Sequence, residues 1–287
     1  MKTRDIFTAL LVPIVLGFGF VIAKPAMQYF PPYLLMGMRF TIPALLLVWW
    51  FPLPKGLYFK LFKVSFIGST LQYGLTYTGL NIIDASSAIL LVQLEVPFGI
   101  IIAFFLLKEV PTIKNIIGLA IAFFGVFILI GAPNLEGKYI GVLLTLSGAF
   151  TWALGAVLAK PLSKEMGAFA LMTWLCVFSG PMLLFVSLVF DGNPVVYFLS
   201  ANFNSWLTVI FLGFFMQPIG YAAWYYVLKK YPVNKVMPVL LILPVTGLLT
   251  SIFLLGEDPP KQVFIGGLII VFGVGLILFT KKNKKYE

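Results

Sequence analysis

The hydrophobic positions of this chain form long unbroken runs, and the charged positions fall in the short stretches between them. Each run holds roughly 20 mostly apolar residues, the length that an α-helix needs to cross the hydrocarbon core of a bilayer. Strands of a membrane barrel would instead alternate in polarity over about ten residues, so the pattern predicts helices. The predicted helices cover residues 6–27, 33–52, 61–82, 85–107, 111–132, 138–160, 166–190, 204–228, 232–255 and 262–280.

Composition is typical of a membrane protein. Of the 287 residues, 61% are hydrophobic and 10% are charged, whereas a soluble domain is about half apolar and about a quarter charged. There is no histidine, and the single cysteine, Cys176, lies inside an apolar run. Histidine-based metal sites, internal disulfides and Ser-His or Cys-His catalysis are therefore excluded. We expect an all-α membrane protein that is not an enzyme and that holds no metal or cofactor.

The basic residues predict the orientation of the chain. Sixteen of the 20 Lys and Arg residues lie on one side of the predicted helices, and three lie on the other side: Lys24, Lys138 and Lys261. Loops that carry the excess of Lys and Arg face the cytoplasm, so both termini are predicted to be cytoplasmic. The formal net charge of +10 then reflects membrane topology, and we expect no nucleic-acid partner. The twentieth basic residue, Arg39, lies inside a run.

The second half of the chain repeats the first. The segment "VIAKPAMQYFPPYLLM", which begins at Val21, aligns with "VLAKPLSKEMGAFALM", which begins at Val157. Each copy contains five predicted helices, and an odd number makes the second copy enter the membrane from the opposite side. The sequence therefore predicts ten transmembrane helices in two inverted repeats, residues 1–136 and 137–287, around a central cavity.

Inverted repeats are typical of secondary transporters, which bind substrate near the bilayer midplane and work by alternating access. The alternative is that the duplication only produced a stable scaffold. Lys24 and Lys160 end the first helix of each repeat, and each is followed by proline. Each lysine can extend its ammonium group to the lipid headgroups; alternatively, each lines one mouth of the transport pathway.

Two ionisable residues lie well inside predicted helices, Arg39 and Glu95. Such residues cost about 3 kcal/mol or more to insert and commonly mark functional sites. Their repeat counterparts, Leu175 and Ile242, are apolar, which argues against a purely architectural role. In one interpretation the two residues form a salt bridge. In the other, Arg39 attracts a substrate carboxylate, while Glu95 meets a cation or takes up the coupling proton, and Pro97 loosens the helix beside it.

Further polar and aromatic side chains are predicted to line the same cavity. In the run 204–228 they recur at helical spacing, and Gln72 and Gln217 occupy matching mid-helix positions of the two repeats. Aromatic stripes also occur as packing or as an interfacial belt, which is the alternative interpretation. Besides Arg39 and Glu95, the candidate site residues are Gln72, Tyr77, Trp152, Gln217, Tyr221, Trp224 and Tyr225.

Two other motifs are predicted to be structural. Gly118 and Gly125 lie seven residues apart, as do Gly266 and Gly273, so each pair shares one helix face and permits close helix approach. Glu109 and Glu257 each precede a helix that opens near proline. We expect each glutamate to cap the N-terminus of the helix that follows it.

These motifs resemble the bacterial EamA-type branch of the drug/metabolite transporter superfamily over nearly all of residues 5–280. The motifs that carry the resemblance are "KPAMQYFPPYLLMGMRF", "LLTLSGAFTWALGAVLAKPL", "GYAAWYYVLKKYPVNKVMPVLLILPVTGLL", "LLKE" and "LLGE". The sequence around Arg39 most resembles that of exporters of O-acetylserine and cysteine. One departure is "GFGF" (Gly17 to Phe20), where the family commonly has tryptophan followed by glycine.

The resemblance implies a ten-helix exporter of amino acids or related small metabolites in the cytoplasmic membrane of a bacterium or archaeon. It implies a small-molecule substrate and the lipid bilayer as partners, with proton coupling and a homodimer left open. An importer or exchanger of a nucleotide sugar, a quaternary amine or a drug-like cation would use the same architecture. A passive channel is a further alternative, and it would show flux that does not saturate.

Overall fold

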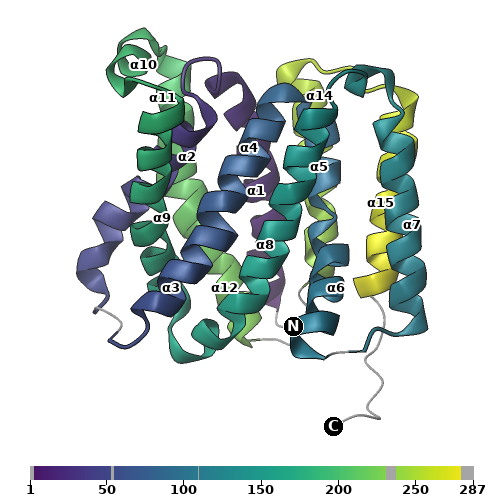
Figure 1. Cartoon of the computed structure of the whole chain (residues 1–287), viewed down its shortest axis with the longest axis horizontal. Helices are drawn as coiled ribbons and strands as arrows, with labels where there is room; N and C mark the ends of the chain where they lie inside the picture. Colours follow the sequence, from purple (N-terminus) through teal and green to yellow (C-terminus); the bar gives the residue numbers. More distant parts are fainter. Residues whose placement is uncertain (1–2, 53–54, 109, 231–236, 279–287) are drawn as a thin grey trace.

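The computed structural model describes residues 3–52, 55–108, 110–230 and 237–278, and the secondary structure in these residues is entirely helical (Figure 1). The helices of the first half are α1 (Thr3–Ala26), α2 (Pro32–Leu47), η1 (Val48–Trp50), α3 (Tyr58–Ser65), η2 (Phe66–Leu71), α4 (Gln72–Ile82), α5 (Ala85–Val92), α6 (Glu95–Leu107), α7 (Ile113–Ile130) and η3 (Pro133–Leu135). Those of the second half are α8 (Tyr139–Glu165), α9 (Ala168–Phe190), α10 (Pro194–Ser200), α11 (Phe203–Ile210), η4 (Phe211–Tyr221), α12 (Ala222–Lys230), η5 (Met237–Leu241), α14 (Ile242–Leu255) and α15 (Lys261–Leu278).

Seven helical segments in the described residues are long and apolar enough to cross a membrane. They are Thr3–Ala26, Pro32–Trp50, Ala85–Leu106, Ile113–Ile130, Tyr139–Ala159, Ala168–Phe190 and Phe203–Trp224. Of the other predicted runs, residues 61–82 fall in α3, η2 and α4, which are not among these seven segments, and the apolar helices Val239–Leu255 and Lys261–Ile277 are shorter. The chain is therefore a multi-pass membrane protein by helix length and composition, and the count of ten spans stays a prediction.

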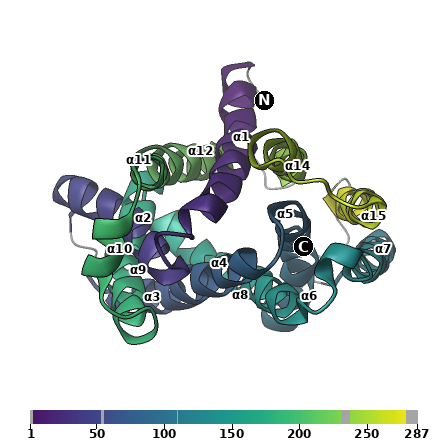
Figure 2. The same cartoon turned by 90° about the horizontal axis from the view of Figure 1, so that it is seen from above.

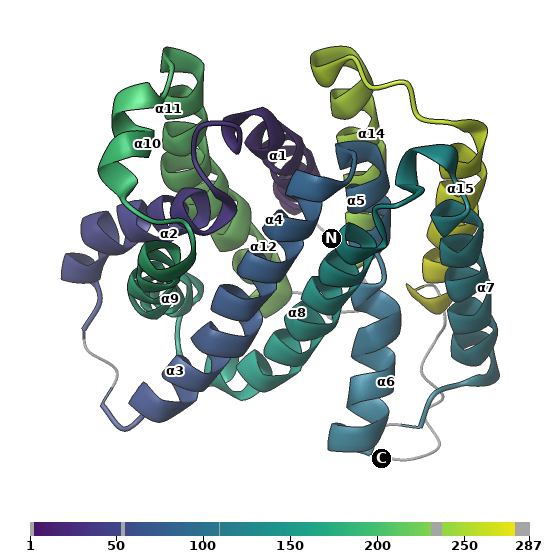
Figure 3. The ribbon, with the colours of Figure 1, turned by 45° about the horizontal axis from the view of Figure 1, so that its top comes forward.

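Most helices form one bundle, and α7 and α15 lie together at one side of it (Figure 2). Within the bundle, α2 lies against α9, α4 against α8, and α1 against α14 and η4; Figure 3 shows α4 and α8 running side by side. We call the end of the bundle where α1 begins the proximal end, and the end where α1 finishes the distal end. These are the lower and upper ends in Figure 1.

Two kinds of helix irregularity recur at equivalent places in the two halves. The π-helical segments η2 and η4 begin at Phe66 and Phe211, and these positions correspond in the repeat alignment. A break also separates α5 from α6, just before Pro97, and the 3₁₀ segment η5 ends just before α14, which carries Pro244. Proline lacks an N–H group, so the helix ladder is interrupted beside it. The predicted loosening of the helix at Pro97 is confirmed by the break.

The glycine pairs bring α7 and α15 into close contact, as predicted. A Cβ atom on Gly118 would lie 2.7 Å from the carbonyl oxygen of Gly273, and one on Gly125 would lie 2.8 Å from that of Gly266. Real Cβ atoms do not approach a carbonyl oxygen so closely, so only glycine allows the two backbones to meet here. The pairing order makes the helices antiparallel, and exchanging the aligned glycines of the two halves maps one contact onto the other.

Candidate functional site

A cavity of about 70 Å³ lies at the centre of the bundle between the two halves of the chain. Seven of the nine candidate residues from the sequence line it: Arg39, Gln72, Tyr77, Glu95, Trp152, Tyr221 and Trp224. Its other lining residues are Leu16, Phe20, Tyr73, Thr76, Ile89, Val92, Met216, Leu240 and Leu243. Gln217 lies outside this lining and contacts Arg39 directly. The side chain of Tyr225 lies outside the described residues.

Arg39 of α2 is fully buried, with 0% of its surface exposed. Its Nε and Nη2 groups donate to Gln217 Oε1 at 3.2 and 3.0 Å, so one amide oxygen from the other half of the chain accepts from both. Nη1 donates to the Tyr77 hydroxyl at 3.0 Å, and Nη2 donates to the Tyr73 hydroxyl at 3.3 Å. Every one of these acceptors is neutral.

Tyr73 also belongs to the site, although it is not among the nine candidates predicted from the sequence. The guanidinium carbon of Arg39 lies 4.6 Å from the centre of the Tyr73 ring, which is the geometry of a cation–π contact. The Tyr73 hydroxyl also hydrogen-bonds to that of Tyr221. Its spacing in the sequence could have indicated this, because Tyr73 precedes Tyr77 by one helical turn and therefore lies on the same helix face.

The salt bridge between Arg39 and Glu95 that one interpretation predicted is not formed. Among the described residues, the ion pairs are Lys138 with Asp84 and Lys230 with Asp5, and none involves Arg39. The physical reason is that Gln217, Tyr73 and Tyr77 already accept the hydrogen bonds of the guanidinium group. Arg39 is thus a buried cation with neutral neighbours, an arrangement that favours the approach of an anion.

Glu95 is the first residue of α6, where the break before Pro97 starts a new helix in the middle of a membrane-spanning run. It is 8% exposed and lines the central cavity. In the part of the chain that the structure describes, no hydrogen bond or ion pair involves its carboxyl group. A buried carboxyl group without a fixed partner is free to exchange a proton or to meet a ligand.

Gln72 begins α4, directly after the π-helical segment η2. It is 7% exposed, and its Nε2 donates to the Thr76 hydroxyl at 3.3 Å. Gln217, its counterpart in the other half, lies within the π-helical segment η4 and has a different partner, since its Nε2 donates to Cys176 Sγ at 3.7 Å. The two repeat-related glutamines therefore lie close to the cavity with different partners.

Lys24 lies at the distal end and turns into the protein. Its ammonium group donates to the carbonyl oxygens of Leu80, at 3.2 Å, and of Ile83 at the end of α4. The prediction that it extends to the headgroups is therefore wrong. The last carbonyls of a helix have no partner within the helix, and α4 presents them to the nearby lysine. The side chain of Lys160 lies outside the described residues.

Glu257 caps a helix, but not the one that follows it. Its two carboxylate oxygens accept from the N–H groups of Ala85, at 2.8 Å, and Ser86, at 2.9 Å, at the start of α5. The prediction that it caps its own following helix is wrong, because the close approach of α5 and α14 brings a different N-terminus to the carboxylate. Lys24 thus binds the end of α4 and Glu257 binds the start of α5, so the two side chains stabilise the turn between these helices. Glu109 lies outside the described residues.

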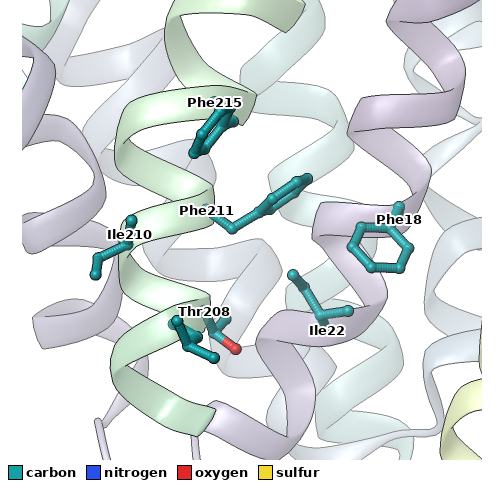
Figure 4. A pocket seen from close by; sticks show the side chains of 7 residues that line it. Phe18, Ile22, Thr208, Ile210, Phe211 and Phe215 are labelled. Carbon is teal, nitrogen blue, oxygen red and sulfur yellow. The ribbon is translucent and has the colours of Figure 1, made fainter. Parts of the chain in front are cut away.

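A second hollow, of about 350 Å³, lies on the outer surface between α1 and the α11–η4 segment (Figure 4). It is lined mainly by apolar side chains, and the Phe18 and Phe211 rings meet edge to face with their centres 5.2 Å apart. Among the described residues, no charged side chain lines it. Both of its walls belong to membrane-spanning helices, so we place the candidate site in the central cavity instead.

Comparison with known proteins agrees with this architecture. A solved crystal structure superposes on 96% of this chain and 99% of its own chain with a TM-score of 0.67 at 18% identity, which shows a shared fold. A protein of Escherichia coli strain K12, named "Probable amino-acid metabolite efflux pump", is 29% identical over 99% of this chain and 98% of its own length. A protein of the same name from Salmonella typhimurium is also 29% identical, over 97% of this chain and 96% of its own length.

The sequence profile described as the EamA-like transporter family matches the chain twice, over residues 3–131 and 139–279. These two matches cover nearly all of the chain, and they fall on its two halves. The chain therefore belongs to the EamA-like transporter family, within the drug/metabolite transporter superfamily.

Proposed function

We propose that this protein is a secondary transporter that exports amino acids or related small metabolites by alternating access. Its family and the names of its relatives support export of small solutes. The observation that carries the proposal is the buried Arg39, whose partners in the described residues are all neutral and which lines the central cavity. An exporter of carboxylate-bearing solutes needs such a cation where the substrate passes.

The proposed mechanism uses two inverted repeats, residues 1–136 and 137–287, with ten spans and both termini in the cytoplasm. The two separate family matches support the repeats. The exchangeable glycine contacts of α7 and α15 and the paired π-helical segments support an inverted arrangement. Rocking of one repeat against the other would then open the central cavity to each side of a bacterial cytoplasmic membrane in turn.

Arg39 binds the substrate carboxylate in this mechanism. The substrate carboxylate displaces the Tyr73 and Tyr77 hydroxyls from the guanidinium group, so two hydrogen bonds to a charged acceptor replace two to neutral acceptors. Gln217 keeps the guanidinium plane oriented, because its Oε1 accepts from both Nε and Nη2. A charged acceptor is preferred here because the surroundings are buried and attraction between opposite charges is strong in a medium of low polarity.

Glu95 carries the coupling proton in this mechanism. It lines the same cavity as Arg39, and none of the described residues holds its carboxyl group. Loss of its proton leaves a carboxylate that attracts a positively charged group of the substrate, while uptake of a proton removes that charge and weakens the attraction. Proton movement across the membrane would in this way be linked to substrate release.

The test is a thermal-shift screen of the purified protein in detergent. The ligands are the twenty standard amino acids and O-acetyl-L-serine, with the decarboxylated amine of each as its control. A ligand that binds the folded state raises the melting temperature by mass action. We expect at least one amino acid to raise it and its decarboxylated amine to raise it less. Equal shifts for the acid and the amine, or no shift for any amino acid, would contradict the role of Arg39.

A further inference from the structure

The side-chain carbonyl of Gln72 is an acceptor without a donor. Gln72 Oε1 is buried and has no hydrogen-bond partner in the described part of the chain. Leaving a buried polar group unpaired costs about 1–3 kcal/mol, and native proteins rarely leave one without a reason. The residue that carries this atom lines the central cavity.

The other repeat shows what such a carbonyl does when a donor is present. Gln217, the repeat counterpart of Gln72, uses its Oε1 to accept two hydrogen bonds from Arg39. The position of Arg39 in the second repeat is occupied by Leu175, so this position offers no cation to Gln72. One glutamine of the pair therefore has an internal cationic donor, and the other has none.

The unpaired acceptors of the cavity belong to two different helices. Gln72 comes from α4, and Glu95 comes from the start of α6. Neither the carbonyl of Gln72 nor the carboxyl group of Glu95 has a partner within the described ranges, and both residues line one cavity of about 70 Å³ with Arg39. The residues that line the cavity thus include a cation with N–H donors, Arg39, and two residues whose acceptor groups have no donor among the described residues, Gln72 and Glu95.

We propose that Gln72 Oε1, together with the Glu95 carboxylate, binds the primary ammonium group of a substrate whose carboxylate is held by Arg39. An ammonium group offers three N–H donors and a positive charge, which matches a neutral carbonyl beside a carboxylate. A quaternary amine has no N–H donor, so it leaves Gln72 unpaired. This inference rests on the proposed function and narrows it to substrates that carry both charged groups of a free amino acid.

The proposal is tested by measuring which chemical groups of the ligand Gln72 recognises. The probe is the standard amino acid that gives the largest thermal shift with the wild-type protein, compared with its N-acetyl derivative, which keeps the carboxylate and loses the ammonium group. Dissociation constants of both are measured for wild type and for Gln72→Leu, which removes the acceptor at similar size. We expect wild type to prefer the free amino acid by about tenfold or more, because hydrogen bonds to charged groups are strong.

In Gln72→Leu this preference is expected to fall to about threefold or less, with little change in affinity for the N-acetyl derivative. The matched control is Thr173→Val, which removes a different buried polar group without a partner, a hydroxyl on α9 outside the cavity lining. It should keep the wild-type preference. A Gln72→Leu protein that melts like wild type and still prefers the free amino acid tenfold would overturn the ammonium site. Absence of binding by any amino acid would instead overturn the proposed function beneath it.

Discussion

At the scale of single residues, Arg39 and its neighbours are the features that most distinguish this chain. The sequence predicted Arg39, Glu95 and the two glutamines from their depth in apolar runs, and the structure brings them to or beside one cavity. Hydropathy could not predict their pairing. Arg39 and Gln217 are 178 positions apart in the chain, and only the packing of α2 against η4 decides that Gln217, and not Glu95, is the partner.

Arg39→Lys should separate charge from hydrogen-bond geometry. Lysine keeps the positive charge but lacks the planar fork that pairs with a carboxylate through two bonds. We expect affinity for a carboxylate-bearing ligand to fall by about tenfold or more, with a small change for the decarboxylated amine. The measurement is a pair of dissociation constants by thermal shift. Equal losses for both ligands, together with a lower melting temperature without ligand, would indicate a structural role instead.

Glu95→Gln should uncouple transport from the proton gradient. Glutamine has nearly the same shape as a protonated glutamate but cannot release a proton. We expect uptake driven by a pH gradient into proteoliposomes to be lost, while exchange of labelled for unlabelled substrate continues. Transport with the wild-type rate and an unchanged dependence on pH would remove the coupling role of this residue.

At the scale of elements, the sequence predicted where helices begin and end better than how they are distorted. Proline explains the break before Pro97, since it removes a backbone donor. The π-helical segments η2 and η4 were not predicted, because a one-residue expansion of a helix leaves the apolar pattern almost unchanged. The helix that Glu257 caps could not be predicted either, since a carboxylate can serve any N-terminus that the tertiary packing brings near.

Glu257→Gln should loosen the turn between α4 and α5. The amide has only one acceptor oxygen and no charge, so at least one of the two backbone N–H groups loses its partner. Loss of a helix cap costs about 0.5–2 kcal/mol, and we expect a lower melting temperature. Glu136→Gln is the control, because Glu136 is exposed and no hydrogen bond of its side chain is found in the described residues. A melting temperature that falls equally in both variants would refute the specific role of Glu257.

At the scale of the whole molecule, the internal repeat was the most informative property of the sequence. It predicted two halves of opposite orientation, and the antiparallel contact of α7 with α15 supports that arrangement. Orientation in the membrane rests on the distribution of Lys and Arg and stays a prediction. The substrate could not be predicted from the repeat, because the repeat determines the framework, whereas in our proposal the bound solute is selected by residues that differ between the halves, such as Arg39.

Gly118→Val should separate α7 from α15. A side chain at this position meets the Gly273 carbonyl oxygen and Ile277, and overpacking of this kind costs about 1–3 kcal/mol. We expect a clear fall in melting temperature. The control is Gly99→Val in α6, where no atom lies within 4 Å of an added Cβ. If the Gly118 variant is as stable as the Gly99 variant, close packing at this contact is not required.

Counterflow in proteoliposomes tests the central claim, transport by alternating access at one central site, most directly. Vesicles containing the purified protein are loaded with an unlabelled amino acid that it binds and are then diluted into a trace of the labelled form. A carrier that exposes one site to each side in turn makes the label accumulate transiently above its outside concentration, and the effect saturates with substrate. Label that only equilibrates, at a rate that rises without limit as concentration rises, would contradict the mechanism and identify a channel.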